Sequence, residues 1–213
     1  MTLQSLRKFG KSHDARARAE LLALAEAETS RLAGLVGNLL DMSRLDAGAV
    51  VVRKAPISPA ELVADALEQA ERSLSGRTVI NEVDGDAPPL VVDDSLFKTA
   101  LANVLENAGK YAPAGSTIRI RSGAEAGDGW IEVEDEGPGL PEPVEPLFEK
   151  FARGVEGDGR PPGTGLGLAI ARGFIQAQGG RIEAINRLDR TGARVRLSAP
   201  LAELEGAERA ETP

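Results

Sequence analysis

The sequence predicts an α+β fold in which three helices cover one face of a mixed, mainly antiparallel sheet, and a long helix precedes this sandwich. Three observations support the prediction. Helical and strand-like patterns are mixed between residues 51 and 200, the strand-like runs come in hairpin pairs, and a stretch with almost no helix breakers stands before them. A chain of 213 residues, 42% of them apolar, is long enough for one ordinary domain and an accessory element.

The first predicted element is a helix over residues 14–46. Its apolar side chains recur in alternating steps of three and four, which is typical of the seam of a helical bundle. The seam consists of Leu21, Leu24, Leu32, Leu35, Leu39 and Met42. Gly48 is expected to end the helix, and Val50–Val52 are expected to begin strand-like structure, which places a boundary within residues 47–54.

Three further helices follow. The run Ser58-Pro59-Ala60-Glu61 combines a capping serine with proline at the first helical position, which predicts a helix over 59–74. Asp94 is expected to cap the second helix. The third is predicted over 165–178 and ends at Gly179-Gly180.

The strands are predicted from alternating apolar and polar side chains. Residues 117–121 and 130–134 form one expected hairpin, and residues 181–185 and 193–197 form another. Residues 81–92 are strand and turn material interrupted by prolines. Residues 201–213 are rich in glutamate and are expected to be a disordered tail.

Composition excludes several classes of protein. The chain has no cysteine, which rules out disulfide frameworks and thiolate chemistry. Its 25 basic and 33 acidic residues give a net charge of −8, so no nucleic-acid partner is expected. No apolar run is long enough to span a membrane, and no membrane contact is expected. An anionic ligand would have to be held by backbone amides, a few placed cations or a bridging metal ion.

Two asparagines on the second predicted helix could carry chemistry. Asn103 and Asn107 are four residues apart and share one helix face among Leu, Val and Ala. Amides in apolar surroundings are unfavourable unless something binds them, and an amide oxygen is a suitable ligand for Mg²⁺. By themselves they are equally compatible with exposed or loop-capping side chains.

Two glycine-rich runs could approach a ligand closely. Asp135-Glu136-Gly137-Pro138-Gly139 follows a predicted strand, so its acid could accept a hydrogen bond from a planar ligand that the glycines admit. Gly163-Thr164-Gly165-Leu166-Gly167-Leu168 opens the third helix and would expose its first amides to phosphate. Alone, the first run also fits an ordinary tight turn. The second lacks the context of a dinucleotide fingerprint.

The segment between these runs combines aromatic and basic residues. Phe148 and Phe151 are three residues apart and are expected to pin a short helix to the core. Lys150, Arg153 and Arg160 could reach an anionic ligand from a mobile loop.

In this order, the four features resemble the asparagine, first glycine, phenylalanine and second glycine boxes of the ATP-binding domain of sensor histidine kinases. That domain has the Bergerat fold, which it shares with gyrase B, Hsp90 and MutL. The resemblance covers residues 51–200. The amino-acid sequence of residues 103–113, 148–154 and 179–187 is especially similar to that of the Kdp-type potassium-responsive sensor kinases.

The resemblance implies ATP and Mg²⁺ as cofactors, with Asn107 as the magnesium ligand, Asn103 near the phosphates and Asp135 on the adenine amino group. The full set of implied ATP contacts is Asn103, Asn107, Lys110, Tyr111, Asp135, Gly137, Gly139, Lys150, Arg153, Gly163, Thr164, Gly165, Leu166, Gly167 and Leu168. Gyrase-like relatives have a water-activating glutamate where this chain has Asn103. An amide there favours phosphoryl transfer to a protein over hydrolysis.

The resemblance also implies that residues 1–50 are part of a dimerisation and phosphotransfer hairpin, with a homodimer and a response-regulator receiver domain as partners and a cytoplasmic location in a membrane-anchored parent. The only histidine, His13, lacks the family's Thr-Pro continuation and stands 25 residues before Asn38, about half the number that a helical return needs at 1.5 Å per residue. We therefore expect His13 to lie in the interhelix turn, and a chain without its acceptor to be unable to phosphorylate itself. An ATPase of the same fold and a non-catalytic nucleotide-binding or interaction module remain alternatives.

Overall fold

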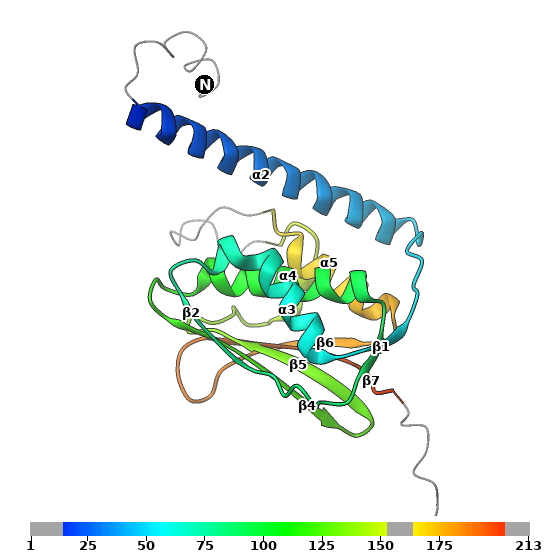
Figure 1. Cartoon of the computed structure of the whole chain (residues 1–213). Coiled ribbons are helices and arrows are strands. Elements are labelled where there is room, and N and C mark those ends of the chain that lie inside the picture. Colours follow the sequence, from blue (N-terminus) through cyan, green and yellow to red (C-terminus); the bar gives the residue numbers. More distant parts are fainter. Residues whose placement is uncertain (1–14, 153–163, 203–213) are drawn as a thin grey trace, which may run out of the picture. The chain divides into compact units, whose positions relative to one another are not determined.

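The structure is a computed structural model, and it describes residues 15–152 and 164–202 (Figure 1). The chain divides into two compact units, Met1–Arg44 and Leu45–Pro213, which are treated separately below. The described part of the first unit is helix α2, Ala15–Asp46, whose last two residues belong to the second unit. The predicted long helix is confirmed. No helix in the described ranges is long and apolar enough to cross a membrane.

Helix α2 ends as predicted, but no strand follows at once. Gly48 has a φ of +60°, and its amide donates to the carbonyl of Leu45 at 3.1 Å. The prediction that strand structure begins at Val50–Val52 was wrong. The first strand is β1, Ala55–Ile57, because that is where the chain first meets a partner strand, with Ala55 opposite Val92.

The second unit contains two sheets. Antiparallel β1 and β3 (Leu90–Val92) form the smaller sheet. The larger sheet has the order β2-β4-β5-β7-β6, in which only β2 and β4 run parallel. Its strands are β2 Thr78–Glu82, β4 Thr117–Glu125, β5 Asp128–Glu134, β6 Arg181–Asn186 and β7 Ala193–Pro200. The predicted mixed, mainly antiparallel sheet and both hairpin pairs are confirmed.

Helices α3 (Pro59–Leu74), α4 (Asp94–Tyr111) and α5 (Gly167–Ala177) lie on one side of this sheet (Figure 1). Ser58 caps α3 as predicted, with its hydroxyl accepting from the amide of Ala60. The cap of α4 is Asp93, not Asp94. Asp93 has extended backbone geometry and accepts from the amide of Leu96 at 3.1 Å, whereas Asp94 is already helical and pairs with Lys98.

The core lies between the sheet and these helices. Alternate residues of the strands point into it, and so do the apolar faces of the helices; fully buried members are Leu62, Phe97, Leu101, Leu105, Ile118, Ile120, Ile131, Ile170 and Leu197. Gly109 lets α4 approach α3 closely, because a Cβ there would stand 2.3 Å from the carbonyl oxygen of Ser73.

The segment before the undescribed residues contains a short 3-10 helix, η1, over Glu145–Phe148. Phe148 is buried as predicted. The prediction that Phe151 pins the segment to the core was wrong: its side chain is 65% exposed, and its φ of 60° turns the chain away from helical geometry three residues after Phe148.

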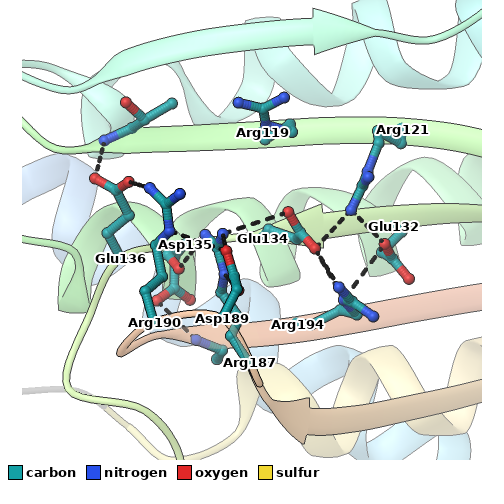
Figure 2. A network of polar contacts seen from close by, with 12 residues as sticks. Arg119, Arg121, Glu132, Glu134, Asp135, Glu136, Arg187, Asp189, Arg190 and Arg194 are labelled. Atoms are coloured by element: carbon teal, nitrogen blue, oxygen red, sulfur yellow. Dashed lines mark hydrogen bonds and ion pairs between the residues drawn. The ribbon is translucent and has the colours of Figure 1, made fainter.

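The opposite side of the sheet, here called the outer face, carries alternating arginines and glutamates (Figure 2). Its central members are Arg119, Arg121, Glu132, Glu134, Arg194 and Arg196. Glu132 and Glu134 are almost fully buried, yet each accepts hydrogen bonds from arginines on neighbouring strands. Among the described residues of the second unit, ion pairs cover the outer face and helices do not.

Candidate functional site

The two predicted asparagines lie against the start of α5. Asn103 is buried, and its amide nitrogen donates to the carbonyl of Thr99 at 3.0 Å. A Cβ added at Gly167 would stand 3.1 Å from Oδ1 of Asn103 and 3.6 Å from Nδ2 of Asn107. The start of α5 thus lies in contact range of both amides, and a side chain at position 167 would crowd the Asn103 amide.

The chain enters α5 through a glycine that a side chain could not replace. Gly165 has a φ of +69°, and a Cβ there would stand 2.5 Å from the carbonyl oxygen of Ala152. Thr164 accepts from the amide of buried Leu166 at 3.2 Å, but no side chain within residues 15–152 and 164–202 caps the helix itself. The first-turn amides of α5 are consequently not satisfied by a capping residue, which is the arrangement that binds anions. Leu168, in that first turn, is half-buried.

Asp135 follows β5 at the other end of the site. It is 8% exposed, and its Oδ1 accepts from the amides of Gly137 at 2.7 Å and Ala193 at 3.2 Å. Burial raises the pKa of this carboxyl, while the two amides and the charge of Arg187 act to lower it. Both described hydrogen bonds use Oδ1, so Oδ2 remains for a ligand.

The glycines after Asp135 bring three parts of the chain together. A Cβ at Gly137 would stand 2.9 Å from Oδ1 of Asp135 and 3.1 Å from the carbonyl oxygen of Tyr111, which ends α4. Gly139 has a φ of +82°, and a Cβ there would stand 2.6 Å from Oδ1 of Asn186. Helix α4 therefore reaches the Asp135 turn with its last residue, and Gly167 with its middle.

The predicted basic and aromatic contacts lie in different places. Lys110 donates to the hydroxyl of Tyr111 at 3.1 Å and stands 4.7 Å from the centre of its ring, both at the end of α4. Lys150 is exposed and pairs with Asp46. Arg153 and Gly163, also predicted to contact ATP, and Arg160 lie outside the described residues.

Residues at the end of β6 and in the turn to β7 contribute to the site and were not predicted. Asn186 holds Leu140 through both backbone groups, at 2.6 Å and 3.0 Å. Arg187 donates to the carbonyl oxygen of Asp135 at 3.3 Å, and a Cβ at Gly192 would stand only 2.0 Å from that oxygen. The available signal was the Asn-Arg pair at the end of a predicted strand, in a segment noted above only for its similarity to the Kdp-type kinases.

Within residues 15–152 and 164–202 there is no group of three or more His, Asp or Glu side chains that could hold a metal ion. A protein cage for a divalent cation is therefore not available in those ranges. The half-buried amide of Asn107 beside Gly167 fits a Mg²⁺ ion that takes most of its ligands from phosphate and water.

Comparisons with known proteins identify the family to which this chain is similar. Residues 92–203 match the family described as histidine kinase-, DNA gyrase B-, and HSP90-like ATPase. Sensor protein KdpD of Escherichia coli K12 is 42% identical over 168 residues, which are 78% of this chain and 18% of KdpD. KdpD of Mycobacterium tuberculosis H37Rv is 40% identical over 173 residues, covering 78% of this chain and 20% of that protein. The chain spans about a fifth of the length of these relatives.

Solved structures show the same fold. Full-length ShkA in complex with AMPPNP superposes with a TM-score of 0.69 at 29% identity, over 89% of this chain and 40% of ShkA. The Acinetobacter baumannii histidine kinase AdeS superposes with a TM-score of 0.68 at 22% identity, over 95% of this chain and 92% of AdeS, which supports the fold alone. Because the family match includes more than half of the chain and the site described above, this chain belongs to the histidine kinase-, DNA gyrase B-, and HSP90-like ATPase family.

Proposed function

We propose that this chain is the ATP-binding region of a sensor histidine kinase, which transfers the γ-phosphoryl group of ATP to a histidine and from there to an aspartate of a response regulator. The observation that carries the proposal is the course of α4. Its middle places Asn103 and Asn107 against Gly167, and its last residue, Tyr111, lies against Gly137 beside Asp135. One helix thereby joins a phosphate-binding end and a base-binding end.

At the base end, Oδ2 of Asp135 accepts from the adenine amino group, and Gly137 and Gly139 leave room for the ring. Lys110 and Tyr111 contact the ribose and the phosphates from the end of α4. At the phosphate end, the segment Gly163–Leu168 presents backbone amides, and Asn103 lines the same region. Lys150 and Arg153 are the proposed cationic contacts to the phosphates.

Mg²⁺ is held by Asn107 together with phosphate oxygens and water. When bound, the metal ion neutralises charge on the β- and γ-phosphates. The protein's own contribution at this end is orientation: the contact between Gly167 and the two amides fixes where the first turn of α5 stands relative to Asn107.

The side chain of Asn103 favours transfer to a protein over hydrolysis. Activating water requires a base, and an amide does not accept a proton near neutral pH. The name of the relatives reported above, sensor protein KdpD, also fits a signalling kinase. We accordingly assign residues 51–200 to ATP binding and residues 1–50 to a helical hairpin that pairs with a second copy. ATP and response regulators are supplied by the cytoplasm, which is where we place the reaction.

We further infer that His13 is not the phosphoacceptor, because the residues after it, Ala15-Arg16-Ala17-Arg18, lack the family's Thr-Pro continuation. His13 lies outside the described residues. Incubation of the chain with radiolabelled ATP should leave His13 unlabelled, and label that disappears in a His13→Ala variant would contradict the inference.

Calorimetry with AMPPNP, with and without Mg²⁺, tests the proposed function. Asp135→Ala should weaken binding by about a hundredfold or more, since a hydrogen bond to a charged group is worth about 1.5–3 kcal/mol and the turn loses its anchor as well. Asn107→Ala should remove the dependence on Mg²⁺. Asp128→Ala and Asn81→Ala are the matched controls, because they remove an acid from the far end of β5 and an exposed amide from β2.

Both controls should bind as the wild-type chain does. Failure of the folded wild-type chain to bind would refute the proposal and favour the interaction module. Turnover of ATP to ADP without any protein acceptor would favour the ATPase.

A further inference from the structure

The turn between β6 and β7 closes over three consecutive acids at the end of β5. Glu134, Asp135 and Glu136 alternate in direction, yet each is held from the β6–β7 side of the molecule (Figure 2). Arg194 of β7 pairs with Glu134 at 2.7 Å, and Arg190 of the turn pairs with Glu136 at 3.0 Å. Asp135 itself receives the amide of Ala193, at the first residue of β7.

Arg187 is the most buried charge in this turn. Its side chain is 9% exposed, and its guanidinium forms two hydrogen bonds to Asp189, at 3.1 Å and 2.8 Å. Nη1 of the same guanidinium donates to the carbonyl oxygen of Asp135 at 3.3 Å, and Nη2 lies 4.0 Å from the carboxylate of Glu134. The planar guanidinium, held in place by Asp189, therefore restrains the peptide that follows Asp135.

Gly192 makes this approach possible. Its φ of +139° and a Cβ position 2.0 Å from the carbonyl oxygen of Asp135 leave no room for a side chain. In the preceding peptide, the amide of Asp135 donates to the carbonyl of Ala193 at 3.0 Å. The backbone of Asp135 is consequently fixed at its amide by β7 and at its carbonyl by Arg187.

We propose that Arg187 is a positioning residue that sets the orientation of the Asp135 carboxylate and thereby the discrimination of this site for a 6-amino purine. The inference rests on the proposed role of Asp135 as the adenine acceptor. The carboxylate uses Oδ1 for Gly137 and Ala193, so the direction of Oδ2 depends on the backbone that Arg187 and Gly192 hold. Loss of the guanidinium frees that backbone without removing any group that touches the nucleotide.

A ligand comparison tests this directly. Calorimetry measures the affinities of ADP and of purine riboside diphosphate, which lacks only the 6-amino group, for wild type, Arg187→Met and Arg187→Lys. The wild-type chain should prefer ADP by roughly ten- to a hundredfold, the range expected for one hydrogen bond to a carboxylate. Arg187→Met should reduce the preference to about threefold or less. Arg187→Lys, which keeps the charge but not the fork, should fall between.

Arg181→Met is the matched control, because Arg181 is the first residue of β6, at the opposite end of the strand from Arg187, and pairs with an acid of β5, Asp128, at 2.7 Å. It should keep the wild-type preference. Asp189→Asn removes the main anchor of Arg187 at an exposed position and should lower the preference even if Arg187→Met does not fold.

Equal weakening of both ligands by Arg187→Met and Asp189→Asn, with the preference intact, would overturn the inference and leave Arg187 a structural residue. That result is distinct from failure of the proposed function, in which the wild-type chain and Asp135→Ala would already show the same small preference. Absence of any preference in a wild-type chain that binds both ligands would refute the role of Asp135 as the adenine acceptor, and with it this inference.

Discussion

Glu134 and Asp135 are neighbours in the chain, are both buried, and yet have opposite surroundings. Glu134 points to the outer face, where Arg121 and Arg194 donate to its Oε1 at 2.6 Å and 2.9 Å. Asp135 points to the helix side, where the described donors to its carboxylate are backbone amides and both reach one oxygen. The comparison separates an acid that the protein satisfies for its own stability from an acid that keeps an oxygen for a ligand.

The same difference appears between two buried amides. Gln178 is fully buried and uses both ends, accepting from the amide of Asp93 at 2.9 Å and donating to the carbonyl of Phe174 at 3.1 Å. Asn103 uses only its nitrogen in the described contacts, and its Oδ1 faces Gly167. Gln178 is therefore a structural amide, whereas Asn103 leaves its oxygen directed at the start of α5.

The largest expected effect concerns the outer face. Glu132 is 2% exposed and pairs with Arg121, Arg194 and Arg196. Glu132→Ala removes the acid that these arginines share, although Arg121 and Arg194 keep Glu134, and should lower the free energy of unfolding by about 2–4 kcal/mol, because several charge-assisted hydrogen bonds are lost at once. Urea denaturation measures this, and the affinity for AMPPNP should change by less than about twofold. A Glu132→Ala variant that is as stable as wild type but binds AMPPNP more weakly would contradict the assignment of the outer-face acids to stability.

Gly167→Ala should give the reverse pattern. Gly167 is the first residue of α5, where alanine gains only part of the about 1 kcal/mol that separates it from glycine in a helix interior, so the free energy of unfolding should change little. The new Cβ would stand 3.1 Å from Oδ1 of Asn103 and must displace an amide, so the affinity for AMPPNP should fall by roughly tenfold. Gly37→Ala, in α2, is a control for the loss of a helical glycine, because no other part of the described chain lies within 4 Å of an added Cβ there, and it should leave binding intact.

The pH dependence of stability should have opposite signs at adjacent acids. Burial raises the pKa of Asp135 in the folded chain above its ordinary 3.8, so its carboxylate destabilises the fold, and that penalty appears as the pH rises from about 3.8 through the folded pKa. The amide of Thr117 and then Arg190 lower the pKa of Glu136 below its ordinary 4.5, so its contribution is present above that pH and is lost as the pH falls through the folded pKa.

Melting temperatures of wild type, Asp135→Asn and Glu136→Gln between pH 3 and 8 measure the pH-dependent contribution of each acid to stability. Asp135→Asn should become more stable relative to wild type as the pH rises, and Glu136→Gln less stable. Parallel curves for the two variants would show that the two acids do not differ in the way the comparison requires.

The smallest effect is expected at the rim of the outer face. Arg119 and Glu82 pair at 2.8 Å, but both side chains are about two-fifths exposed. Arg119→Ala should lower the free energy of unfolding by less than about 1 kcal/mol, and the difference should vanish in 1 M NaCl. A loss as large as that of Glu132→Ala would mean that burial is not what distinguishes the outer-face acids.

Much of the fold was predictable because its signals are local. The serine cap and proline of Ser58-Pro59 fixed the start of α3, and side-chain alternation located both hairpins within a few residues. The errors were also local in kind. Asp93 and Asp94 are equally good capping residues by type, and only the extended backbone of Asp93 distinguishes them. Phe148 and Phe151 differ in burial because the chain leaves helical geometry between them.

The sequence by itself determined the element types, the core-facing pattern and the motif residues Asn103, Asn107, Asp135 and Gly167. These depend on the spacing of residues within one helix or one turn, which lie close together in the sequence. Only the tertiary structure decided that Gly167 lies against both asparagines, that Gly137 meets Tyr111, and that Arg187 and Gly192 fix Asp135. Those contacts join residues about 25 to 65 positions apart, and they depend on strand register and helix packing. A shift of one residue in the β5–β7 ladder would turn Asp135 to the opposite face of the sheet.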